Sequence, residues 1–163
     1  MILTDLASMI LRLAELVFAT IVAAVNGQYL HTISDSTTHW QQARFIYTEV
    51  VAGLGIFFAL IWLIPFSGSF VHWPMDLFIS ACWFAAFGVL VNYLNGPNGT
   101  CGYIFSWSDV TIRGDNPCGK FKAVIAFSFL SALCWLASSI IGLMWVRDHE
   151  NRYRRRTWYR SRV

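Results

Sequence analysis

Four charged side chains lie within or beside long apolar segments, where an ionisable group is costly and often functional. Arg12 and Glu15 interrupt the first segment, Glu49 lies in the second, and Asp76 lies near the start of the third. A helix would place Arg12 and Glu15, three residues apart, on one face, where they can form an ion pair. At 1.5 Å per residue, Glu15 approaches the expected bilayer midplane, so a proton or ion relay is the alternative. The structural pair is the favoured interpretation.

The other two charges have different local settings. Asp76 follows Trp73-Pro74, and proline suits the first turn of a helix while a carboxylate is favourable near the positive helix end. Asp76 is therefore interpreted as a helix-start residue. Glu49 lies about one turn inside its segment and can be wetted from outside or bonded to a loop. Its role stays open.

The remaining reactive residue types do not form a catalytic pattern. No serine is accompanied by a suitable histidine and carboxylate, and no glycine-rich phosphate loop is present. The histidines are scattered among the expected loops and tail: His31, His39, His72 and His149. We therefore expect no enzyme activity, no cofactor and no metal site. Binding to nucleic acid is not expected either, because it would need a soluble module.

These side chains must be positioned by helices that cross a membrane. The sequence of 163 residues is 56% hydrophobic and only 13% charged, whereas soluble domains contain about 25% charged residues. Four apolar segments are each long enough to cross a hydrocarbon core of about 30 Å. The predicted fold class is an all-α membrane protein, a bundle of four transmembrane helices over residues 6–26, 45–64, 73–94 and 123–146. The connections are expected at 28–42, 65–69 and 95–122.

Basic residues predict the orientation of the bundle. Seven of the twelve lysines and arginines lie in the C-terminal segment, which favours a cytosolic position for that segment. An even number of spans then places the N-terminus in the cytosol too. The arginines are also suited to an anionic inner leaflet, at about 1 kcal/mol per residue near the surface. They are Arg147, Arg152, Arg154, Arg155, Arg156, Arg160 and Arg162.

The last connection would then face the exterior or a lumen, where oxidation is permitted. Cys101 and Cys118 lie in it, and a disulfide between them would stabilise the loop by about 3 kcal/mol. A pair of free thiols is the alternative. Asn98 begins an Asn-Gly-Thr sequon, but it lies close to the expected membrane surface, and this crowding argues against glycosylation. The fold is therefore expected to carry a disulfide-closed second extracellular or lumenal loop.

The last two apolar segments contain small residues four positions apart, a spacing that lets helices approach closely. Packing inside the bundle is favoured over contact between copies of the chain. Broken helices and paired repeats, which are typical of transporters, are absent from the sequence. The pairs are Ala81 with Ala85, Ser128 with Ala132, and Ser138 with Gly142.

Several stretches carry a resemblance to a known family. They are Trp73-Pro-Met-Asp76, Ala81-Cys-Trp-Phe-Ala-Ala-Phe-Gly88, Cys118-Gly-Lys-Phe-Lys-Ala123, Ala126-Phe-Ser-Phe-Leu-Ser131 and Trp135-Leu-Ala137. With four spans, a short inner hairpin and a cysteine pair in the second outer loop, the chain resembles the MARVEL-domain tetraspan proteins, in particular their fungal branch. Claudins would place their cysteine pair in the first outer loop, and tetraspanins would need a much larger second loop.

The resemblance implies a MARVEL-like transmembrane domain at 6–146, followed by a basic cytosolic tail at 147–163. It implies no catalysis, and its expected roles are organisation of sterol- or sphingolipid-rich microdomains, membrane apposition and vesicle trafficking, in the plasma membrane or an endomembrane. Partners would be the bilayer and a second copy or another membrane protein. Two alternatives are a small accessory subunit of a larger membrane complex and a proton-coupled transporter or channel using Glu15.

Overall fold

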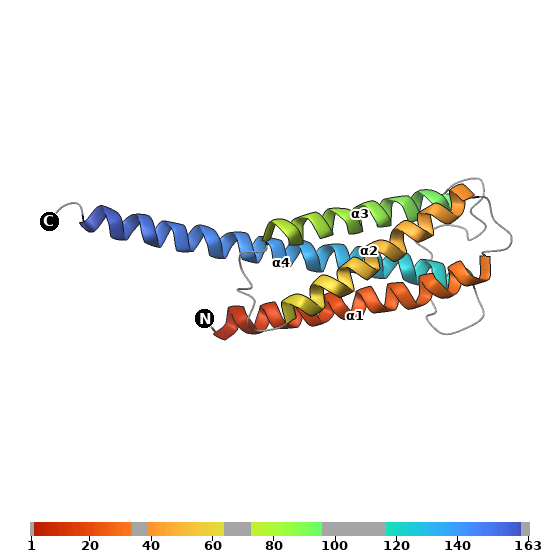
Figure 1. The fold of residues 1–163 in the computed structure, drawn as a ribbon, viewed down its shortest axis with the longest axis horizontal. Coiled ribbons are helices and arrows are strands. Elements are labelled where there is room, and N and C mark those ends of the chain that lie inside the picture. The colour runs from red at the N-terminus through yellow and green to blue at the C-terminus, as the bar shows by residue number, and fades with distance from the viewer. Residues whose placement is uncertain (1, 34–38, 64–72, 96–116, 161–163) are drawn as a thin grey trace.

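A computed structural model describes residues 2–33, 39–63, 73–95 and 117–160, and each of these ranges is a single helix. The helices are α1 (Ile2–Ile33), α2 (His39–Leu63), α3 (Trp73–Asn95) and α4 (Pro117–Arg160). They run alternately up and down the bundle, so that α1 begins and α4 ends toward the same end (Figure 1). The predicted all-helical architecture is confirmed for the residues that the structure describes.

All four helices are long and apolar enough to cross a membrane. The apolar spans within them are Leu6–His31, Gln42–Leu63, Trp73–Leu94 and Cys118–Asp148. Large apolar side chains on the outside of the bundle, such as Phe57, Phe78 and Met144, are exposed, as expected for side chains that meet lipid. The chain is therefore a multi-pass integral membrane protein.

Three helices, α1, α2 and α4, are clearly longer than the hydropathy of the sequence predicts. α1 continues to Ile33, so the predicted loop at 28–42 is wrong at both of its ends, because α2 also begins earlier, at His39. α4 begins at Pro117 and continues to Arg160, well beyond the predicted range of 123–146. A helix boundary predicted from hydropathy falls at the last apolar residue, but the helix itself continues as long as its backbone hydrogen bonds can form. No proline or glycine follows Gly142, and arginine is a good helix former.

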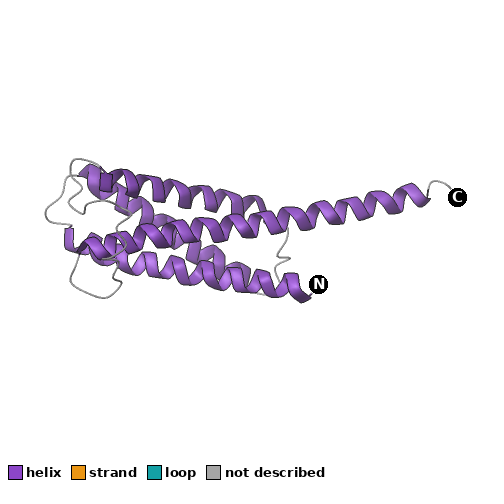
Figure 2. Ribbon diagram, turned by 180° about the vertical axis from the view of Figure 1, so that it is seen from behind, coloured by secondary structure: helices purple, strands orange, loops and turns teal. Residues whose placement is uncertain are grey.

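As a result, the last part of α4 projects beyond the other three helices (Figure 2). At 1.5 Å per residue, Arg160 lies about 20 Å from Arg147 along the helix axis. The arginine-rich segment is therefore a helical continuation of the last span up to Arg160.

The helix α2 runs obliquely across the bundle (Figure 1). Near its start, the Arg44 guanidinium lies 5.7 Å from the ring centre of Tyr93, at the end of α3. Near its end, Trp62 lies 4.7 Å from the guanidinium of Arg12, close to the start of α1. In between, Trp83 of α3 is fully buried and lies against Gly55 of α2. The core thus depends on close approach at Gly55.

Replacing Gly55 by leucine is expected to destabilise the bundle by about 2 kcal/mol relative to the matched Gly53→Leu variant. A Cβ atom at Gly55 would lie 3.4 Å from two atoms of the Trp83 indole and 3.6 Å from Cβ of Ala19, so a larger side chain must push the helices apart. A Cβ atom at Gly53 meets nothing within 4 Å. Both changes gain the same helix propensity, which cancels in the comparison. Thermal unfolding in detergent measures the difference, and equal midpoints would show that Gly55 is not needed for packing.

Candidate functional site

A buried polar cluster ties three helices together near the end of the bundle at which α1 begins. We define the inner polar cluster as Arg12, Glu15, Asp76 and Ser138. Arg12 Nη1 donates to Glu15 Oε2 at 2.9 Å, and Arg12 Nη2 donates to Asp76 Oδ2 at 2.7 Å. Ser138 Oγ donates to Glu15 Oε1 at 2.6 Å. The predicted Arg12–Glu15 pair is present, and it is part of a larger network from α1, α3 and α4.

Two tryptophans enclose the charged centre of this cluster. The guanidinium carbon of Arg12 lies 4.7 Å from the ring centre of Trp62 and 5.2 Å from that of Trp135. The two indoles contact each other edge to face, with ring centres 5.7 Å apart. A cation against an aromatic face is stabilised electrostatically, and more so when water is excluded. The inner polar cluster is therefore a buried ion-pair network with an aromatic wall.

The inner polar cluster joins α1 to the first turn of α3. Asp76 lies in the first turn of α3, as predicted, and its bond to Arg12 brings the cluster to the level of that turn. The nearby backbone carbonyl of Trp73 accepts a hydrogen bond from Ser139 of α4. Along α1, Glu15 lies nine residues after the start of the span Leu6–His31 and three to four residues before its midpoint, so it is nearer to the middle of that span than to its end.

The opposite end of the bundle is held by an amide and by aromatic rings. Asn26 Nδ2 of α1 donates to the carbonyl oxygen of Phe45 at 2.9 Å and to Glu49 Oε2 at 2.8 Å. This hydrogen bond between Asn26 and Glu49 thus links α1 to α2. Beside this contact, each helix contributes one ring to a cluster with neighbouring ring centres 4.8–6.0 Å apart, formed by Tyr29, Phe45, Tyr93 and Phe121.

The pairs of small residues divide into internal and external ones. Ser128 and Ala132 are fully buried, and the carbonyl oxygen of Ala132 accepts a hydrogen bond from Ser80 of α3 at 2.9 Å. These residues pack inside the bundle, as predicted. Ala81 and Ala85, in contrast, are exposed on α3. The prediction of internal packing is therefore wrong for the Ala81–Ala85 pair.

Some predicted site residues lie outside the described residues. These are Asn98, Cys101 and Arg162, so the sequon and the Cys101–Cys118 disulfide remain predictions. Cys118 itself lies in the first turn of α4. Arg147 is exposed, and the helix continues through Arg152, Arg154, Arg155, Arg156 and Arg160. Cys82 and Cys134, within the spans, are free thiols.

Sequence reasoning missed three partners of the buried charges. Ser138 stands out in the sequence only as a small residue, although a serine in an apolar span can also serve as a hydrogen-bond donor. Asn26 ends the first apolar run. An amide side chain at this position is a signal that could have indicated a hydrogen bond to another helix. The Arg12–Asp76 contact joins residues 64 positions apart, and no local pattern indicates it.

The arrangement of these groups is suited to holding helices together. In the parts of the chain that the structure describes, no three potential metal ligands come together. The polar contacts cross from one helix to another at both ends of the bundle, and the buried Trp83 lies between them. Inside a membrane, such contacts and close packing replace the hydrophobic driving force between helices.

Comparison with known proteins agrees with this four-helix architecture. Residues 5–141 match the family model described as MARVEL, a membrane-associating domain. This range contains the first three spans completely and most of the fourth. No individually curated protein matches the sequence at a significant level. The chain belongs to the MARVEL family of membrane-associating domains.

Proposed function

We propose that this protein is a non-enzymatic membrane organiser that forms lateral assemblies in sterol- or sphingolipid-rich membrane and so supports microdomains, membrane apposition or vesicle trafficking. The observation that carries the proposal is the inner polar cluster, whose charged groups bind one another across α1, α3 and α4. Such a network favours a rigid bundle with a constant outer surface. A constant surface is what lateral assembly requires.

The same cluster argues against the transporter alternative. A relay through Glu15 needs a carboxylate that exchanges protons with water on each side of the membrane in turn. The Glu15 side chain is fully buried, and its two oxygens are bound by Arg12 and Ser138. These contacts support a structural role for Glu15.

The outer surface of α3 supports lateral association. Ala81, Ala85 and Gly88 are exposed and lie on one face of the helix, at spacings of four and three residues. A Cβ atom added at Gly88 would meet nothing within 4 Å, so another helix has room to approach. Small exposed residues allow close helix contact in a membrane. A second copy of the chain is the proposed neighbour, and a different membrane protein is the alternative.

The arginine-rich segment is proposed to lie in the cytosol and to interact with an anionic leaflet. Attraction to the leaflet fades within a Debye length, about 8–10 Å. Because α4 carries this segment away from the bundle, Arg147 and Arg152 are expected to contribute more than Arg160. The Cys101–Cys118 disulfide is proposed for the opposite side, which would be extracellular or lumenal.

Cysteine crosslinking in membranes tests the proposed assembly. In a background with Cys82 and Cys134 replaced by alanine, Ala85→Cys is expected to form disulfide-linked homodimers on mild oxidation. Leu54→Cys is the matched control, because Leu54 is an exposed side chain on α2, a different helix. Equal, weak crosslinking of both variants would contradict self-association through α3.

Two further outcomes separate the alternative functions. Capture of one foreign protein at equal stoichiometry by a crosslinker attached at Ala85→Cys would favour an accessory subunit. Proton flux into liposomes that is abolished by Glu15→Gln would favour a transporter or channel. Homodimers without flux are the result expected for a membrane organiser.

A further inference from the structure

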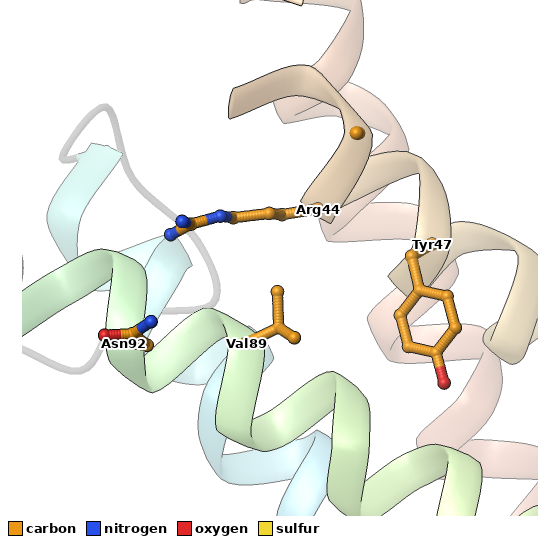
Figure 3. A pocket seen from close by; sticks show the side chains of 5 residues that line it. Arg44, Tyr47, Val89 and Asn92 are labelled. Carbon is orange, nitrogen blue, oxygen red and sulfur yellow. The ribbon is translucent and has the colours of Figure 1, made fainter. Parts of the chain in front are cut away.

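A cavity of about 340 Å³ lies between α2 and α3, near the end of the bundle where α2 begins. Its lining residues are Ala43, Arg44, Tyr47, Val89 and Asn92. In Figure 3 the Arg44 side chain extends from α2 over Asn92 of α3, with Val89 below it and Tyr47 on the other side. The volume lies in the range of small-molecule sites, about 300–1,000 Å³. The cavity therefore combines a cation and an amide with an apolar wall.

Arg44 is the charged residue among those that line the cavity. It is half-buried and lies near the start of the span Gln42–Leu63. Its guanidinium lies over the ring of Tyr93, but it forms no ion pair with a carboxylate among the residues that the structure describes. A guanidinium presents five donors in a planar fork that matches phosphate oxygens. An arginine at this depth without a carboxylate partner is thus complementary to an anion in the headgroup region.

The rest of the cavity fits the part of a lipid that follows its phosphate. Tyr47 Oη donates to the carbonyl oxygen of Cys82 at 3.3 Å, so this side chain bridges from α2 to α3 below Arg44. Val89 is half-buried and gives an apolar wall on the α3 side.

We propose that this cavity binds the phosphodiester of a membrane phospholipid, with Arg44 paired to the phosphate oxygens and the Asn92 amide as a second donor. The glycerol and the upper acyl chain lie along Val89. The surrounding bilayer supplies the ligand, and the charge of Arg44 selects a phosphate-bearing lipid over an uncharged one. The site requires only that the bundle lies in a membrane, and it does not depend on self-association through α3.

Native mass spectrometry of the full chain, purified in mild detergent supplemented with phosphatidylcholine, tests this proposal. The wild-type protein is expected to retain one phosphatidylcholine, and Arg44→Gln is expected to weaken that retention on the order of tenfold. Arg44→Lys should restore part of it, because a point charge remains. The matched control is Arg147→Gln, which removes an exposed arginine on α4 and should retain lipid like wild type.

A second variant keeps the test valid if Arg44→Gln folds poorly. Val89→Trp fills the cavity from the α3 side without touching the arginine charge, and it is expected to lose the lipid while its thermal unfolding is unchanged. Equal retention by wild type, Arg44→Gln and Val89→Trp would overturn the proposal. Retention of a phosphate-free sterol in place of phosphatidylcholine would overturn it as well. Crosslinking at Ala85→Cys, measured in the same variants, reports separately on the proposed assembly.

Discussion

Replacing Arg12 by alanine is expected to lower the free energy of unfolding by about 3–5 kcal/mol, the largest effect of any single polar substitution in this chain. Arg12 is the only cation within the inner polar cluster, and it binds both Glu15 and Asp76. Without it, these two buried carboxylates lose the cation that both of them bind. The destabilisation arises mainly from these uncompensated negative charges, and the missing arginine bonds themselves account for less of it.

The measurement is unfolding in detergent or nanodiscs, followed by tryptophan fluorescence or by denaturant titration. Arg147→Ala is the matched control, because it removes an arginine from an exposed position and should change stability little. A triple variant, Arg12→Met with Glu15→Gln and Asp76→Asn, should recover a large part of the stability, since no uncompensated charge then stays buried.

This pattern distinguishes an ion-pair network from a simple packing role. If the triple variant were as unstable as Arg12→Ala, the hydrogen bonds and tryptophan contacts of the arginine, which methionine cannot make, would be responsible rather than uncompensated carboxylate charge. If Arg12→Ala unfolded like wild type, the inner polar cluster would not hold the bundle together, and the main support for the proposed function would be removed.

Replacing Trp83 by alanine is expected to cost about 3–5 kcal/mol by leaving a cavity at the centre of the bundle. The Trp83 side chain is fully buried between α3 and the backbone of α2 at Gly55. Its indole nitrogen has no hydrogen-bond partner among the described residues, so it contributes by filling space. Trp83→Phe should therefore cost much less than Trp83→Ala, because most of the ring volume remains.

The control for Trp83 is Phe78→Ala on the same helix, since Phe78 is 62% exposed and faces outward. Both variants remove an aromatic ring, but only one of them creates an internal cavity. Unfolding midpoints in detergent should fall strongly for Trp83→Ala and little for Phe78→Ala. Equal decreases would mean that the α2–α3 contact does not depend on the tryptophan.

Much of the fold could be predicted from the sequence because membrane spans obey strong local rules. In hydrocarbon, each backbone polar group must be satisfied within its own segment, so a long apolar run predicts a helix. The third helix shows this best, predicted at 73–94 and observed as Trp73–Asn95, because Pro74 marks its start and polar residues follow its end. Helix ends were predicted poorly where polar residues continue the helix, as in α4. Hydropathy indicates which part of a helix lies in the membrane, whereas the end of the helix depends on its backbone hydrogen bonds.

The candidate site could be predicted only in part. The Arg12–Glu15 pair follows from a three-residue spacing on one helix, and Asp76 in the first turn of α3 follows from its position after proline. The link between Arg12 and Asp76 does not follow, because it depends on how two helices are rotated toward each other. Asn26 and Ser138 escaped prediction as partners for the same reason.

The sequence by itself therefore determined that the chain crosses the membrane with four helices and which charged side chains lie within or beside them. Only the tertiary structure decided that Arg12 also binds Asp76, that Ala81 and Ala85 face outward, and that Arg44 lies at a cavity between α2 and α3. The physical reason is that helix formation in a membrane is governed by local hydropathy and backbone hydrogen bonding. The rotation and crossing of helices depend instead on contacts such as Trp83 against Gly55, which join residues distant in the sequence.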